Sequence, residues 1–347
     1  MTRGRSLKGA AAAAWVPLAL SLFVIVAALL ASLGGPALDR TVLLSLVYLL
    51  IVVGLYSFVG NSGVFSFGHM SFMAIGAYTA AILTIRLQVA PVLAIGAGVV
   101  LAMVAGYLLA LLVARLSGLY LGMATIAFAL FLGVLATNGG ELTGGPTGLF
   151  GALSTLTTTH VVVITLLVVL ALAANERASF GRKVDAVRED PQLAVSLGID
   201  VNRIRRRVFI VSGALGATAG GMTSLLRSTV SPETIGFHLV VTALTMIIVG
   251  GALSWAGAAI GAVIFTWLPS LLQFVGEWQP LVYGILVAIA AVYVPNGLLG
   301  VLQQGWRGMQ ARRHRIPAEG AGAVPVAETA DAEHALAALA DRAEAQP

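Results

Sequence analysis

Long apolar runs separated by short polar breaks occupy most of the chain between residues 13 and 300. A helix needs about 20 mostly apolar residues to cross a bilayer, and ten stretches fit or approach that length. They comprise residues 13–33, 41–59, 67–85, 91–114, 119–137, 159–174, 208–226, 239–253, 256–275 and 280–298, of which the eighth is short. The pattern predicts an all-α polytopic membrane protein with about ten transmembrane helices.

The composition agrees with this assignment. Apolar residues make up 59% of the chain and charged residues 10%, whereas charged residues are about a quarter of a soluble domain. The absence of cysteine excludes disulfides, thiolate metal sites and cysteine nucleophiles. Small residues spaced four apart favour close contacts between membrane helices. They predict close crossings at Ala102 with Gly106, at Gly213 with Ala217, and at Gly257 with Gly261.

The basic residues are distributed unevenly over the breaks between the apolar stretches. If the N-terminus is cytoplasmic, seventeen of the 20 lysines and arginines fall on the inner side, and Arg40, Arg86 and Arg227 fall outside. Cytoplasmic loops of membrane proteins carry an excess of positive residues. The asymmetry therefore predicts that both termini and the polar break at 175–207 lie in the cytoplasm.

The same pattern divides the chain into three regions. Residues 1–12 form a cytoplasmic N-terminal segment, residues 13–300 a transmembrane domain and residues 301–347 a cytoplasmic tail. The tail is rich in Ala, Glu and Pro and poor in large apolar residues. We expect it to be disordered, because such a segment cannot bury enough apolar surface to fold.

The polar break contains the signals of a short helix in "DPQLAVSLG". Asp190 suits the N-cap, Pro191 the first helical position and Gly198 the left-handed residue that ends helices. About seven helical residues are predicted between them. A helix this short is marginal alone, so Leu193, Ala194 and Leu197 need a partner surface.

Two partners for this short helix remain open. Its apolar residues could pack on the ends of the chain's own spans or lie among lipid headgroups. Alternatively the helix docks into another subunit, with Arg188, Glu189 and Asp190 as charged neighbours. The run "RIRRR", Arg203 to Arg207, is expected to anchor the next span at the headgroups rather than to bind a partner.

The chain lacks the residues that would let it use ATP or a proton gradient by itself. The two lysines, Lys8 and Lys183, follow Leu7 and Arg182, so no Walker A loop is present. No Asp, Glu, Lys or Arg lies well inside a predicted span, which disfavours a proton-coupled carrier. Sodium coupling through backbone carbonyls stays open.

Histidines offer little further chemistry. The five histidines are scattered without the spacing of metal ligands, so no metal site is predicted. His69, in "SFGHMSF", is expected near the start of a helix. It is either a hydrogen-bonded structural residue or a proton carrier.

Three segments resemble a known family. They are "SFGHMSFMAIGAYTAA" (66–81), "LTGGPTGL" (142–149) and "GRKVDAVREDPQLAVSLGIDVNRIRRRVFIVSGALGATAGGM" (181–222). All three are similar to segments of the LivM-like permease subunits of high-affinity branched-chain amino acid ABC importers, in the same order along the chain. The resemblance implies a permease fold like that of the vitamin B12 and ribose importers.

The resemblance also implies partners and a location. The partners are a second, LivH-like permease, two cytoplasmic ATPase subunits that use the ATP, an extracytoplasmic solute-binding protein and the bilayer of a bacterial inner membrane. The chain itself would be a transporter subunit and not an enzyme, with no cofactor of its own.

The resemblance, together with the short helix, assigns three groups of site residues. Contact with an ATPase subunit is assigned to Arg188, Glu189, Asp190, Pro191, Leu193, Ala194, Leu197 and Gly198. The translocation pathway is assigned to Ser66, Phe67, Gly68 and His69. Docking of the binding protein, or the pathway mouth, is assigned to Thr143, Gly144, Gly145, Pro146 and Gly148, whose alternative is a plain surface turn.

The substrate remains open between several classes. The chain differs from the commonest family forms at Thr147, Val64 and Phe65, and importers of urea and short-chain amides share the same permease motifs. A self-sufficient channel or ion-coupled carrier for a small polar solute is the competing interpretation.

Overall fold

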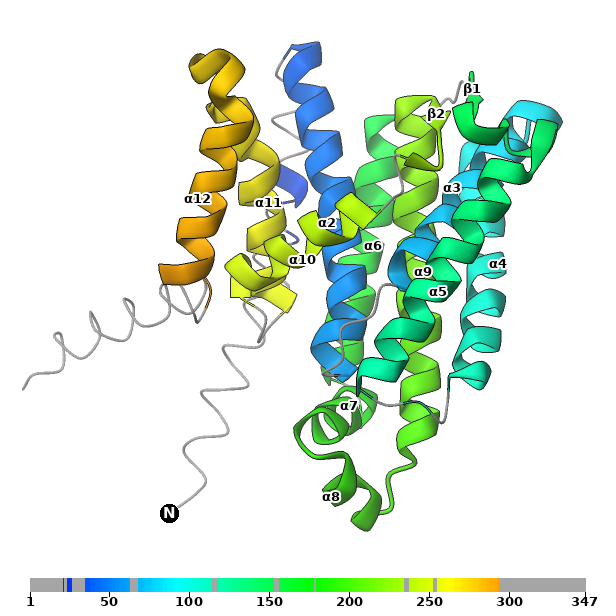
Figure 1. The fold of residues 1–347 in the computed structure, drawn as a ribbon, viewed down its shortest axis with the longest axis vertical. Coiled ribbons are helices and arrows are strands. Elements are labelled where there is room, and N and C mark those ends of the chain that lie inside the picture. Colours follow the sequence, from blue (N-terminus) through cyan, green and yellow to red (C-terminus); the bar gives the residue numbers. More distant parts are fainter. Residues whose placement is uncertain are drawn as a thin grey trace, which may run out of the picture. The chain divides into compact units, whose positions relative to one another are not determined.

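The structure is a computed structural model that describes residues 21, 24–26, 35–62, 68–113, 116, 118–152, 156–177, 179–233, 237–251, 255–293 and 297. The predicted first span at 13–33 lies almost wholly outside these residues, and the N-terminal segment and the tail lie entirely outside them. The described elements are helical apart from one two-stranded sheet (Figure 1).

Each of the other nine predicted stretches contains a helix. The α-helices are α2 (Pro36–Ser62), α3 (Gly68–Leu87), α4 (Pro91–Leu112), α5 (Gly118–Asn138), α6 (Thr158–Arg177), α7 (Ser179–Glu189), α8 (Pro191–Ser196), α9 (Val201–Arg227), α10 (Phe237–Gly251), α11 (Trp255–Leu271) and α12 (Gln279–Tyr293). Three 3₁₀ helices and two strands complete the description: η1 (Gly140–Leu142), η2 (Gly145–Thr147), η4 (Gln273–Trp278), β1 (Leu149–Phe150) and β2 (Thr229–Val230).

The all-α polytopic class is confirmed, while the number of spans stays a prediction. Among the described helices, α2, α3, α4, α5 and α9 are long and apolar enough to cross a membrane. The predicted eighth and ninth spans are α10 and α11, which meet at a bend of 118° and together form a broken span or a re-entrant pair. Helix α10 has the 15 residues that the apolar pattern suggested, whereas α11, with 17 residues, is shorter than its predicted stretch.

Helix α9 is the centre of the packing. It contacts α2, α3 and α4 along its length, and 78% of its most apolar window is buried, against 22% for α5. Its glycines explain the close approach. A Cβ at Gly220 would lie 2.0 Å from the carbonyl oxygen of Met73, and a Cβ at Gly76 of α3 would lie 2.2 Å from that of Ala217.

The predicted close crossings of small residues are confirmed. A Cβ on Gly213 would lie 3.2 Å from the Ala102 oxygen, so α9 crosses α4 closely there. A Cβ on Gly261 of α11 would lie 2.0 Å from the Met246 carbonyl oxygen of α10, so the backbones of these two helices are in close contact there. The bend between these two helices therefore depends on backbone contact that a larger residue would prevent.

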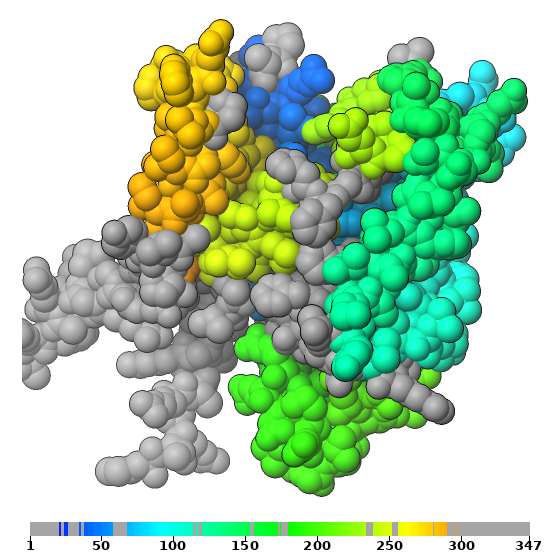
Figure 2. Space-filling view, viewed as in Figure 1, coloured from blue at the N-terminus to red at the C-terminus, as the bar shows by residue number. Residues whose placement is uncertain are grey.

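The two ends of α9 carry different structures. At 1.5 Å per residue, its 27 residues span about 40 Å. Helices α7 and α8 precede its N-terminal end, and β2 follows its C-terminal end (Figures 1 and 2). The segment rich in charge and the β1–β2 sheet therefore lie at opposite ends of the spans.

Candidate functional site

Helix α7 connects α6 to the short helix and was not anticipated as a separate element. Val184 and Val187 are buried against the neighbouring helices, and Phe180 is partly buried in the same cluster. The signal was present in the sequence, because these residues recur three and four positions apart, as on one face of a helix. The many charged residues on the other face of α7 concealed this helical spacing.

The predicted short helix is confirmed as α8. Asp190 has extended backbone angles, and its Oδ1 atom accepts hydrogen bonds from the amides of Gln192 at 2.8 Å and Leu193 at 3.1 Å. Pro191 occupies the first helical position, where its missing amide hydrogen has no consequence. Both start signals act as the sequence indicated.

The end of α8 is equally well defined. Gly198 has φ +77°, and its amide donates to the Val195 oxygen at 2.9 Å. The Ile199 amide donates to the Ala194 oxygen at 3.0 Å, which completes a Schellman motif. Asp200 then caps α9 by accepting from the Arg203 amide at 2.9 Å. Two adjoining caps therefore fix how α8 joins α9.

The apolar residues of α8 face two directions. Leu193, Val195 and Leu197 have exposed fractions of 58%, 62% and 68%. Packing of Leu193 and Leu197 on the chain's own spans is therefore not observed. Ala194 is 1% exposed and lies in the cluster that includes Ile199. This corrects its assignment as a partner contact, because its side chain holds α8 against the rest of the chain.

The charged residues around α8 have mixed surroundings. Asp190 is used in capping, Glu189 is exposed, and Asp200 forms an exposed ion pair of 3.6 Å with Arg203. The Arg207 guanidinium lies 6.0 Å from the centre of the Phe180 ring, within the range of a cation–π contact. One arginine of "RIRRR" thus ties α9 to α7, and headgroup anchoring by this run stays a prediction.

His69 is the second residue of α3, near the helix start as expected, and is 2% exposed. Its Nδ1 atom lies 3.1 Å from the Ser212 hydroxyl, which donates to the Gly54 oxygen at 3.1 Å. A Cβ on Gly54 would lie 2.5 Å from the imidazole. The ring therefore fills a slot between α2 and α9 with its Nδ1 atom hydrogen-bonded, whereas its buried Nε2 atom has no hydrogen-bond partner among the described residues.

The pathway assignment stays a prediction. Gly68 is buried beside His69, and Ser66 and Phe67 lie outside the described residues. Further along α3, Ser71 and Tyr78 line a cavity of about 30 Å³ whose other wall includes Gly133 of α5. Neither hydroxyl has a hydrogen-bond partner in the described part of the chain. The sequence pointed to neither, although their spacing of seven places them on one helix face.

The predicted turn at "TGGPTGL" has a fixed backbone. Gly144 has φ +75°, and a Cβ there would lie 1.9 Å from the Gly148 oxygen. Gly148 has φ +81°, and its Cβ would lie 2.1 Å from the Val230 oxygen. The following strand β1 pairs antiparallel with β2, with Leu149 opposite Val230. The turn is therefore held against the end of α9, and its role in docking stays a prediction.

No group of three or more His, Cys, Asp or Glu side chains within the described ranges could hold a metal ion. The described part of the chain combines apolar spans, a central glycine-rich helix and a doubly capped helix at one end. They define a polytopic helical membrane protein that presents a rigid apolar surface outside its spans.

The family model described as "Branched-chain amino acid transport system / permease component" matches residues 37–291, and the chain belongs to this family. The predicted membership is confirmed. No solved structure matches the chain.

Curated relatives include both kinds of permease. The chain is 30% identical over 298 residues to the high-affinity branched-chain amino acid transport system permease protein LivM of Escherichia coli K12, covering 74% of this chain and 68% of LivM. It is 27% identical over 281 residues to the corresponding LivH protein of E. coli K12, covering 73% and 91% of the two chains. A probable LivH of Methanocaldococcus jannaschii is 30% identical over 292 residues, covering 76% and 92%.

Proposed function

We propose that the chain is the transmembrane permease subunit of an ABC importer for branched-chain amino acids, and that separate subunits supply the energy. The observation that carries the proposal is the exposed apolar surface of Leu193, Val195 and Leu197 on α8, in a chain of the branched-chain permease family. A surface of this kind on a short, doubly capped helix suits insertion into a groove of an ATPase subunit.

The attachment of α8 supports transmission of movement. Its Schellman motif and the Asp200 cap join it to α9 without a free linker. Helix α9 is in turn packed against α2, α3 and α4. A displacement of α8 by a bound subunit would therefore reach the centre of the spans and change their packing.

The proposed assembly contains partners of three kinds. A second related permease completes the membrane part, two ATPase subunits bind on the side of α8 and hydrolyse ATP, and a solute-binding protein docks at the turn of Thr143, Gly144, Gly145, Pro146 and Gly148. The chain has no Gly-Lys pair and thus no Walker A loop of its own. The assembly would lie in a bacterial inner membrane, with both termini of this chain in the cytoplasm.

Reconstitution tests the proposal against the competing carrier. Proteoliposomes that contain the purified complex should accumulate radiolabelled leucine when ATP is available to the ATPase subunits. Liposomes that contain the chain alone should show no leucine flux under the same gradients. Uptake by the chain alone would indicate an ion-coupled carrier or channel and contradict the proposal.

A further inference from the structure

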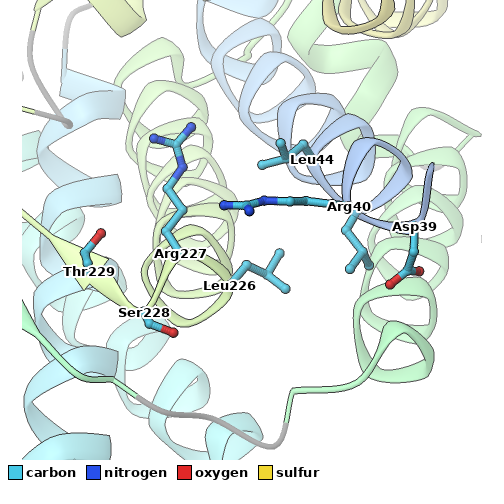
Figure 3. A pocket seen from close by; sticks show the side chains of 8 residues that line it. Asp39, Arg40, Leu44, Leu226, Arg227, Ser228 and Thr229 are labelled. Atoms are coloured by element: carbon cyan, nitrogen blue, oxygen red, sulfur yellow. The ribbon is translucent and has the colours of Figure 1, made fainter. Parts of the chain in front are cut away.

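A pocket of about 650 Å³ opens between the beginning of α2 and the end of α9 (Figure 3). It lies at the end of the spans that also carries β1 and β2, because Thr229 begins β2. The described residues that line it are Asp39, Arg40, Leu43, Leu44, Leu226, Arg227, Ser228 and Thr229.

Two positive charges line the pocket. Arg40 and Arg227 are exposed, and neither forms an ion pair with any of the residues that the structure describes. Figure 3 shows the Arg40 side chain reaching from α2 towards α9, where Arg227 is the last helical residue. Two guanidinium groups at one pocket repel each other, so an anion between them is favoured.

The acidic residue of the lining does not neutralise these arginines. The Asp39 carboxylate is turned away from both guanidinium groups (Figure 3) and accepts a hydrogen bond of 3.1 Å from the Thr158 hydroxyl at the start of α6. Arginine binds carboxylates with paired, charge-assisted hydrogen bonds. The pocket is therefore built for a carboxylate rather than for a cation.

The other lining residues determine which groups can accompany the carboxylate in a bound ligand. Leu43, Leu44 and Leu226 form an apolar wall, and the hydroxyls of Ser228 and Thr229 can accept hydrogen bonds from an ammonium group. We propose that this pocket is an outer acceptance site for a free aliphatic α-amino acid, whose carboxylate binds Arg40 and Arg227 and whose branched side chain lies against the leucines. The inference rests on the proposed function.

The position of the pocket suits such a site. The backbone carbonyl oxygen of Ser228 accepts hydrogen bonds from the Gly151 amide at 3.0 Å and the Ala152 amide at 3.3 Å. The rim is therefore tied to the residues directly after β1, which follows the "TGGPTGL" turn, the proposed docking surface of the binding protein. A solute released at that turn would meet the pocket directly.

Equilibrium binding to the purified chain in nanodiscs tests the site. Radiolabelled leucine should bind, and 4-methylpentanoate, which keeps the carboxylate and the branched chain, should displace it. Leucinamide should not, because it lacks the carboxylate. Arg40→Gln and Arg227→Gln should each weaken leucine binding about tenfold or more, as expected for loss of a charge-assisted hydrogen bond.

Arg86→Gln is the matched control. Arg86 lies at the same end of the spans outside the pocket, where its guanidinium donates to the backbone carbonyl oxygen of Glu141, so leucine affinity should stay unchanged. Unaltered affinity in both pocket variants, absence of leucine binding by the unsubstituted chain, or displacement by leucinamide would overturn the site. Displacement by phosphatidylglycerol vesicles would do so as well, and would assign the arginines to lipid.

Two further outcomes distinguish a leucine site from a contact with the binding protein, and failure of this inference from failure of the proposed function. If the pocket variants bind leucine normally but lose the binding protein, the arginines contact acidic side chains of that protein and the inference fails. If the complete transporter with either variant takes up leucine at the unsubstituted rate, the inference fails while the proposed function stands. Only failure of ATP-driven uptake by the unsubstituted complex contradicts the proposed function itself.

Discussion

Single residues decide where the segment outside the spans changes direction. Asp190 starts α8, Gly198 ends it and Asp200 starts α9, each through a backbone geometry that its side chain or its lack of one allows. All three act over fewer than five residues. Local chemistry of this kind is legible in a sequence, which is why the start and end of α8 were predicted correctly.

Asp190→Ala tests the first of these positions. The substitution removes the acceptor of two amide hydrogen bonds and should destabilise α8 by about 1 kcal/mol, the usual effect of losing an N-cap. Limited proteolysis of the purified chain should then cut faster around α8. Asp185→Ala, at an exposed position of α7, should leave the cleavage rate unchanged, and equal rates in the two variants would contradict the capping role.

Gly148→Ala tests the backbone of the "TGGPTGL" turn. An alanine would have to adopt φ +81° with its Cβ 2.1 Å from the Val230 oxygen, so the turn should shift and the thermal stability fall. Gly96→Ala is the comparison, because a Cβ there meets nothing within 4 Å and lies in a helix where alanine is favoured. A melting temperature as high for Gly148→Ala as for Gly96→Ala would show that the turn is not constrained.

At the scale of elements, the positions of the helices were predicted from the sequence better than the angles and contacts between them. The apolar period revealed the spans, but the bend of 118° between α10 and α11 depends on contacts between two helices. The spacing of Gly257 and Gly261 predicted a close contact there, but a pattern along one helix carries no record of the angle at which its partner meets it. Helix α7 was missed although Phe180, Val184 and Val187 recur at helical spacing, because the charged residues between them concealed this apolar face.

Gly76→Ala tests the crossing of α3 and α9. The new methyl group would lie 2.2 Å from the Ala217 oxygen, so the two helices must separate. Overpacking of this kind destabilises by about 1–3 kcal/mol, and we expect a lower melting temperature in detergent and a reduced yield of folded protein. Unchanged stability relative to Gly96→Ala would contradict the central position of α9.

At the scale of the whole molecule, α9 connects the exposed surface of α8 to the pocket at the other end of the spans. Its first residue follows the caps of α8, and its last residue lines the pocket with Arg40. The sequence could not predict that pocket, because Arg40 and Arg227 are far apart along the chain and come together only through the packing of α2 on α9. One buried helix thus connects the proposed ATPase contact to the proposed solute site.

The recovery of ATPase subunits with the affinity-purified chain tests this account most directly. The variants are Leu193→Glu and Leu197→Glu, which place a charge on the exposed surface of α8 without touching buried Ala194. Leu142→Glu is the control, because Leu142 is similarly exposed in η1, at the opposite end of the spans.

Burying an unpaired carboxylate in an interface is strongly unfavourable. At equal amounts of chain in the membrane, both α8 variants should recover the ATPase subunits at least about tenfold less well, and Leu142→Glu should recover them normally. Normal recovery with Leu193→Glu and Leu197→Glu would contradict the account.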